Sequence, residues 1–524
     1  MPKSKVMRTT KLLYAALVLT LMTGACKQAP VSNILTRTTP EAEGVSSQGI
    51  LDFLDAAAKS QNEFHSLVFL RHGKIVAEGW WDPYQADLKH TLYSASKSFT
   101  ATAVGFAVTE KKLTVNDKVV SFFPDDLPDT VSPFLAGMTV KDLLTMTAGQ
   151  DPDPTFSVIM SDSNWVRSFL SLPIVNKPGT KFLYNTLATY MLSAIVQKVT
   201  GEKLIDYLTP RLFQPLGIEG MDWETDPREI NTGGWGLRLK TEDMARFGQL
   251  FLQKGKWNGK QILPASWIEE ATTAWIDQAP DAPQAKKDSS DWMQGYCYQM
   301  WRCRNNGFRA DGAYGQYIIV LPAQDAVIAI TSETRNMQDE LNLVWQYLLP
   351  AMQKGKLPDN DQLTASLTLK LSSLAIAPPE KGTDSPMATE ISEKIFTMDP
   401  NEKGIESISF LFMTDMCHVS LKKDSTDYQL AFGAGKWLID ETAKRGPNLV
   451  SSEKVSFTRM DKVKVAGSFR WQDRNTLELV IRYIESPHTE TMICKFDGKK
   501  LELNDLTSNN PGTNAPVLKG KIKN

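Results

Sequence analysis

Histidine and cysteine are scarce in this chain of 524 residues, with five of each, and no close His/Cys cluster occurs. Metal sites in proteins usually need several such ligands near one another, so we expect neither a metal nor another cofactor. The formal net charge is only −2, which argues against a nucleic-acid partner. The length predicts two or three domains, and a content of 42% hydrophobic and 23% charged residues is typical of a globular protein.

The chain also lacks a transmembrane-length apolar run near its N-terminus. The run from Leu12 to Met22 is too short to span a membrane as a stable helix. It follows a basic start and precedes small residues, which predicts a signal peptide over residues 1–25. Cys26 comes next and, in a lipoprotein signal, would become the lipidated, membrane-anchoring first residue of the mature protein. The alternative is an ordinary cleaved export signal followed by a chance cysteine. Both interpretations predict export, and the first predicts a periplasmic or outer-membrane-anchored bacterial lipoprotein.

The motif Ser94-x-x-Lys97 stands where small and polar residues give way to an apolar helical run. This places a hydroxyl and an amine one turn apart at the positive end of a predicted helix. A serine is a weak nucleophile until a base takes its proton, and a desolvated lysine can be that base. The same motif begins at Ser420 and Ser451, but neither opens an apolar helix, so we interpret both as surface residues. The alternative for Ser94 is a helix-capping serine beside a solvated Lys97.

Four further segments accompany this motif. Residues 65–79 contain two apolar runs joined at His72-Gly73, which predicts a β-hairpin upstream of Ser94. Residues 178–186 contain Pro-Gly-x-x-Phe-x-Tyr and end in Tyr184-Asn185-Thr186. A Gly-rich turn at 233–236 holds Trp235. Residues 308–320 are punctuated by glycine and continue into a strand of the buried type.

Together these segments resemble the class C β-lactamase-like family of penicillin-recognising serine hydrolases, over roughly residues 40–350. The resemblance implies an α+β fold: an α/β sandwich of an antiparallel sheet flanked by helices, with an inserted helical region. It implies that Ser94 is the nucleophile, Lys97 the base, and Tyr184 the group that passes a proton to the leaving group. It also implies an oxyanion hole made of the backbone N–H groups of Ser94 and Ala313.

The chain departs from this family at two motifs. Thr186 stands where the family's second motif has Asn, with Asn185 in the middle position, and Ala310-Asp311-Gly312 aligns with Lys-Thr-Gly. The resemblance places Asn185, Thr186, Asp311 and Gly312 in the substrate-binding site, and Gly312 allows close backbone approach. Trp235 either lines the cleft or packs in the core. Because the missing lysine helps to hold the substrate carboxylate, we expect weak β-lactam hydrolysis and better activity on uncharged short-chain esters.

The domain organisation follows from changes in composition. Residues 30–353 are expected to form the hydrolase domain, followed by a linker. Residues 365–524 alternate apolar and polar positions, most clearly at 477–483, which predicts an all-β accessory domain, a small barrel or a sandwich. Since the catalytic motifs end before this domain, we expect a chain that ends near Gln353 to fold and to hydrolyse small esters.

The function that the sequence favours is an exported serine hydrolase that acts through an acyl-enzyme on esters, small amides or peptides. The alternatives are a non-hydrolytic, penicillin-binding-like sensing or binding protein, and a weak β-lactamase or D-Ala carboxypeptidase. Loss of the family's Asn and Lys motivates the non-hydrolytic alternative.

Overall fold

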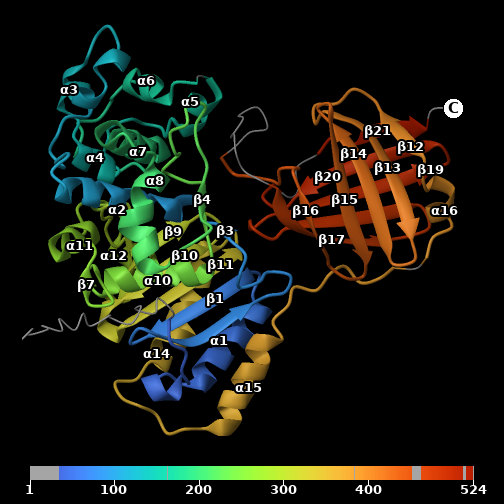
Figure 1. Ribbon diagram of the computed structural model, residues 1–524, viewed down its shortest axis with the longest axis horizontal. Helices are drawn as coiled ribbons and strands as arrows, with labels where there is room; N and C mark the ends of the chain where they lie inside the picture. The colour runs from blue at the N-terminus through green and yellow to red at the C-terminus, as the bar shows by residue number, and fades with distance from the viewer. Residues whose placement is uncertain (1–34, 162, 383, 451–461, 511–514, 523–524) are drawn as a thin grey trace, which may run out of the picture.

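The computed structural model describes residues 35–161, 163–382, 384–450, 462–510 and 515–522. The predicted signal peptide over 1–25 and the predicted lipidation at Cys26 lie outside the described residues. Figure 1 shows a sheet-and-helix region and, beside it, a barrel of strands. In the described part of the chain, no helix combines the length and apolar character needed to cross a bilayer.

The first region is built on a six-stranded antiparallel sheet. The hairpin predicted at His72-Gly73 is confirmed: it joins the first two strands, and both turn residues have positive φ, 49° and 74°. The sheet order is β2 (Lys74–Trp80), β1 (Glu63–Arg71), β11 (Ala326–Glu333), β10 (Gln316–Leu321), β9 (Phe308–Gly312), β8 (Trp301–Arg302).

Helices cover both faces of this sheet. The amphipathic helix α1 (Ser47–Lys59) buries Ile50, Phe53 and Leu54 against one face, together with α13 (Met337–Leu343) and α14 (Leu349–Ala351). On the other face, α10 (Thr241–Leu252) packs against β1, β10 and β11. This arrangement confirms the predicted antiparallel sheet between helices.

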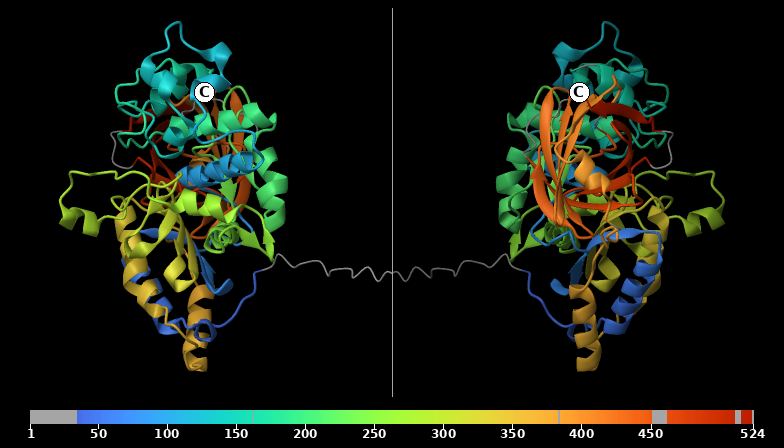
Figure 2. Two further views of the ribbon diagram at one scale, coloured as in Figure 1. Left: turned by 90° about the vertical axis from the view of Figure 1, so that its left-hand side faces the viewer. Right: turned by 90° about the vertical axis from the view of Figure 1, so that its right-hand side faces the viewer.

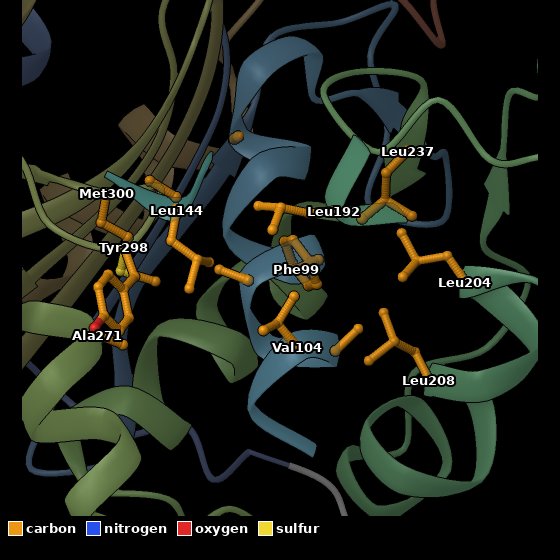
Figure 3. Close-up of a cluster of buried hydrophobic side chains, with 14 of the residues drawn as sticks. Phe99, Val104, Leu144, Leu192, Leu204, Leu208, Leu237, Ala271, Tyr298 and Met300 are labelled. Atoms are coloured by element: carbon orange, nitrogen blue, oxygen red, sulfur yellow. The ribbon is translucent and has the colours of Figure 1, made fainter. Parts of the chain in front are cut away.

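The inserted helical region lies above the sheet in Figure 1. At its base, α2 (Ser96–Thr109) is buried along nearly its whole length, as expected of a helix that carries small or apolar residues on every face. Phe99 and Val104 of α2 pack among leucines of the insertion, Leu192, Leu204 and Leu208 (Figure 3). The insertion comprises α3 (Pro133–Gly137), α4 (Val140–Leu144), α5 (Thr155–Ser161), α6 (Trp165–Leu170), α7 (Thr186–Thr200) and α8 (Leu204–Leu208).

The C-terminal domain is a closed barrel, which confirms the all-β prediction. Nine of the described strands run in antiparallel order, and the barrel is closed by a short parallel pairing of β15 with β17. The strands are β12 (Ile395–Met398), β13 (Ile405–Met413), β14 (Met416–Lys423), β15 (Thr426–Ala434), β16 (Leu438–Thr442, appended to β17), β17 (Val463–Trp471), β18 (Thr476–Tyr483), β19 (Thr489–Asp497), β20 (Lys500–Thr507) and β21 (Leu518–Ile522).

The expected domain boundary at residue 365 falls inside a helix of the first region. Helix α15 (Asp361–Ser372) packs on α1, as both views of Figure 2 show, where Leu367 is buried and Lys370 pairs with Asp55 at 2.8 Å. The barrel's core begins only with α16 (Met387–Ile391) and β12. The composition change near 354–361 therefore marks a surface loop, and the barrel starts about twenty residues later than expected.

The barrel docks on the segment that leads to Ser94. The Thr91 N–H donates to the Glu485 carbonyl at 2.9 Å, and the Tyr84 hydroxyl donates to the Ser486 carbonyl at 3.1 Å. Arg482 of β18 forms an ion pair with Glu63 of β1. Contacts between residues some 400 positions apart thus place the barrel beside the candidate site.

Candidate active site

Ser94 lies at a junction that several elements fix. The preceding strand β3 (His90–Thr91) pairs with β5 (Leu237–Leu239), and the Leu92 N–H donates to the Leu237 carbonyl at 3.0 Å. A single 3-10 turn, Tyr93–Ala95, then leads directly into α2. Ser94 opens into a cavity of about 380 Å³ lined by Tyr93, Asp153, Thr155, Phe156, Tyr184, Thr186, Gly234, Trp235, Trp292, Trp301, Asp311, Ala313, Met337, Leu449 and Val450.

The Lys97 amine lies 3.0 Å from the Ser94 hydroxyl oxygen. It also donates to the Gly234 carbonyl at 2.8 Å and to the Thr186 hydroxyl at 3.3 Å. The side chain is buried, and burial lowers the pKa of Lys97 to about 7, with partial opposition from the carboxylates of Asp153 and Asp311. At neutral pH a large share of the amine is therefore unprotonated and able to accept the proton of Ser94.

The Tyr184 ring faces the Lys97 amine, with its centroid 4.9 Å from the nitrogen. The ring stacks on Trp301 at 5.5 Å, which fixes its orientation. Burial raises the pKa of Tyr184 above its ordinary value, and its interaction with Ser94 offsets only part of that rise. Tyr184 is therefore a neutral hydroxyl in the free protein, suited to relay a proton and less suited than Lys97 to remove one.

Thr186 and Asn185 have different roles in the structure. Thr186 lines the cavity and contacts Lys97, so it occupies the place where a polar partner of the amine is needed. Asn185 is buried and caps α7: its side-chain oxygen accepts from the Ala188 N–H at 3.2 Å, and its amide donates to Gln150 at 3.1 Å. Asn185 is not among the described lining residues of the cavity, so it caps a helix instead of binding substrate as expected. An Asn directly before an apolar helix is itself a sequence signal for an N-cap.

Gly312 brings the edge of the sheet against the Ser94 segment. A Cβ at this position would lie 2.1 Å from the Leu92 carbonyl oxygen, a distance no side chain can accept. The glycine ends β9, so the next residue, Ala313, lines the same cavity as Ser94. Both residues expected to supply the oxyanion-hole amides therefore face one cavity.

A model of the Beta-lactamase family matches residues 58–351, more than half of the chain. The chain belongs to the beta-lactamase family. Among curated relatives, the 6-aminohexanoate-dimer hydrolase of Paenarthrobacter ureafaciens is 23% identical over 284 residues, 50% of this chain and 71% of that protein. The Beta-lactamase of Escherichia coli K12 is 26% identical over 191 residues, 33% of this chain and 50% of that protein, so the chain spans only half of this relative.

A solved structure shows the same fold. A Bacillus anthracis protein, provisionally named a 6-aminohexanoate-dimer hydrolase, superposes with a TM-score of 0.50 at 22% identity. The match covers 62% of this chain and 89% of that one. These relatives place the chain in a family of hydrolases, and the solved structure adds a likeness of fold.

This member of the beta-lactamase family carries an internal ion pair in the segment expected to align with the family's third motif. Asp311 lines the cavity and is bonded by the Arg309 guanidinium at 2.8 Å, with both side chains buried. Burial raises the pKa of Asp311, and Arg309 opposes part of that rise. Arg309 does not reach the described cavity lining, so its charge is directed to Asp311 and not to a substrate.

Several cavity residues were not predicted from the sequence. Trp235, which the sequence predicts with two alternatives, fulfils both: it is 1% exposed, donates to Glu224 at 3.0 Å, and still lines the cavity. The other residues of this group have no such sequence signal. Asp153 at the rim and Trp301 beneath Tyr184 carry no motif. Leu449 and Val450 come from the C-terminal part of the chain, where no catalytic pattern was found. Among the described residues, no group of His, Cys, Asp and Glu is arranged to hold a metal ion.

Proposed function

We propose that this protein is a serine hydrolase that acts through an acyl-enzyme. The observation that carries the proposal is the buried Lys97 amine, 3.0 Å from the Ser94 hydroxyl, with its pKa lowered to about 7. Ser94 attacks a carbonyl carbon while Lys97 takes its proton, and the developing oxyanion is bound by the N–H groups of Ser94 and Ala313. Tyr184 passes a proton to the leaving group. Water, activated by Tyr184 and Lys97, then releases the acyl group from Ser94.

The cavity lining supports uncharged esters and small amides as substrates, with peptides as a further class. Its walls carry apolar side chains from four parts of the chain: Phe156, Trp292, Met337 and Leu449. No Lys or Arg is among the described lining residues, whereas Asp153 and Asp311 are. A substrate carboxylate would therefore gain no ion pair from the described lining, and the Asp153 carboxylate would repel it. The name of the Paenarthrobacter relative, a hydrolase of an aminohexanoate dimer, agrees with the amide class.

The test is to expose the purified protein to a fluorophosphonate probe and to measure its intact mass, alongside turnover of nitrophenyl acetate. We expect one adduct on the wild-type chain, on Ser94, and none on Ser94→Ala, with ester turnover reduced to background in that variant. An unlabelled wild-type protein, or a Ser94→Ala variant with full activity, would refute the proposal. A protein that is acylated once by an ester but never turns over would instead support the non-hydrolytic binding alternative.

We also propose that the protein is exported and anchored by a lipid on Cys26. The support is the sequence of residues 1–26 alone. Mass spectrometry of the mature protein from a bacterial host should find a lipidated N-terminal Cys26. A mature chain that starts elsewhere, without lipid, would favour the ordinary export signal.

A further inference from the structure

A histidine of the barrel reaches the residue next to the proposed nucleophile. His488 lies in the connection between β18 and β19, and its side chain is fully buried. Its Nε2 is 2.6 Å from the hydroxyl oxygen of Tyr93, and its Nδ1 is 2.7 Å from Glu333 Oε1. Since Tyr93 directly precedes Ser94, a chain of hydrogen bonds connects the barrel, the sheet strand β11 and the proposed active site.

The partners fix the direction of these hydrogen bonds. The Glu333 carboxylate can only accept, so in the neutral tautomer of His488 the ring proton is on Nδ1 and Nε2 accepts from the Tyr93 hydroxyl. The Tyr93 oxygen itself accepts from the Leu449 N–H at 3.4 Å. Glu333 also accepts from the Ser508 hydroxyl at 2.7 Å. Burial raises the pKa of Tyr93 well above its ordinary value, which keeps this hydroxyl a donor.

His488 also contacts the residue next to the other expected oxyanion donor. The Tyr314 ring meets the imidazole edge to face, with ring centroids 4.7 Å apart, and Tyr314 directly follows Ala313. Both tyrosines have positive φ, 46° at Tyr93 and 64° at Tyr314. Bulky residues rarely adopt this conformation, and it persists only where surrounding contacts enforce it.

We propose that His488 is a positioning residue for the oxyanion hole of the hydrolase proposed above. It bonds Tyr93 and packs on Tyr314, and through their constrained backbones it sets where the N–H groups of Ser94 and Ala313 point. His488 is not among the described lining residues of the cavity, so it acts through the two tyrosines and not on substrate. The barrel domain thereby becomes part of the catalytic machinery. This inference rests on the proposed function, because it assigns the oxyanion hole of that same site.

Two substitutions separate positioning from mere docking of the barrel. The amide of Gln can reach the place of His Nε2, so His488→Gln keeps an acceptor for Tyr93 and loses the bond to Glu333. The amide of Asn reaches only the place of Nδ1, so His488→Asn keeps the bond to Glu333 and loses the one to Tyr93. We expect His488→Asn to lower kcat for nitrophenyl acetate at least tenfold, with KM changed less than twofold, because a displaced oxyanion donor affects the transition state. His488→Gln should keep most of the wild-type kcat.

A matched pair of tyrosine variants completes the test. Tyr93→Phe should reproduce the loss in kcat of His488→Asn, and the double variant should be no worse than either single one. Tyr84→Phe removes another hydroxyl that bonds the barrel, to the Ser486 carbonyl, and should leave kcat unchanged. Equal activity of His488→Asn and His488→Gln, or a Tyr93→Phe variant with kcat within twofold of wild type, would overturn the inference. These ratios are measured against an active wild type, whereas a wild type without turnover or labelling refutes the proposed function itself.

Discussion

Lys97 is the residue on which the proposed chemistry depends, because its charge at neutral pH is set by burial. Below its pKa of about 7 the amine is protonated and cannot accept the Ser94 proton. We therefore expect kcat/KM for a neutral ester to rise about tenfold per pH unit up to about pH 7, and to level off above it. A rate profile over pH 5–9 measures this, and Lys97→Arg should be inactive throughout, since its guanidinium stays charged.

Asp153 offers a second test of this profile, with Asp151 as its control. Its carboxylate raises the pKa of Lys97 against the dominant effect of burial, so Asp153→Asn should move the midpoint to lower pH. Asp151→Asn removes a nearby charge that pairs with Lys181 at 2.8 Å outside the described cavity lining, and should leave the midpoint in place. A profile without a midpoint between pH 6 and 8 would show that another group is the base.

Asp311 bears on the choice of substrate. It lines the cavity at a position that the sequence aligns with the Thr of the family's third motif, and the Arg309 guanidinium is paired with it. We expect kcat/KM for nitrocefin, which carries a carboxylate, to be far below that for nitrophenyl acetate. Comparable values for the two substrates would show that a cation reaches the substrate carboxylate after all. An Asp311 variant is a poor test, because removing one partner of a buried pair costs roughly 3–5 kcal/mol of stability.

At the scale of elements, the close contact between the end of β9 and the turn that carries Ser94 sets the geometry of the site. Gly312→Ala would place a Cβ 2.1 Å from the Leu92 carbonyl oxygen, so the strand must move away from Ser94. We expect kcat to fall more than tenfold while the circular dichroism spectrum stays native. Gly137→Ala, where no atom lies within 4 Å of the added Cβ, is the matched control and should be fully active. Equal activity of both variants would remove Ala313 from the proposed oxyanion hole.

The sequence predicted elements better than the contacts between them. The hairpin at 72–73, the helix after Ser94 and the alternating strand at 477–483 follow from local periodicity and turn residues, and all three are present. The helix at 361–372 was missed because few of its residues are buried and its apolar pattern is weak. His488 and Leu449 carry no local signal, since their partners lie hundreds of residues earlier in the chain.

For the whole molecule, the docked barrel changes what truncation should do. The sequence predicts that a chain ending near Gln353 keeps ester hydrolysis, and this remains untested. The contacts now argue against it: such a chain lacks α15, which covers α1, and lacks the barrel residues that line the cavity and bond Tyr93. Some of these contacts are charged, so their contribution to the stability of the protein can be measured as a function of pH.

The ion pair between Glu63 and Arg482 makes that docking sensitive to acid. Burial would raise the pKa of Glu63, but the hydrogen bond from His65 and the charge of Arg482 outweigh burial and lower it to about 2. A carboxylate with a lowered pKa stabilises the folded state above its unfolded pKa of about 4.3, and this contribution is lost as pH falls toward 2. Glu63→Gln should therefore lower the melting temperature at pH 7, and its difference from wild type should shrink between pH 5 and pH 3.

Calorimetry of both proteins over this range provides the measurement. Asp55→Asn serves as the control, because it breaks an exposed pair with Lys370, and exposed pairs contribute little to stability. That variant should melt within about a degree of wild type at pH 7. A Glu63→Gln variant that is as stable as wild type at pH 7, or whose deficit stays constant down to pH 3, would show that this ion pair does not hold the barrel. In that case docking would rest on the other contacts, among them the Arg238–Glu485 ion pair at 3.4 Å and the hydrogen bonds of Thr91, Tyr84 and Tyr93.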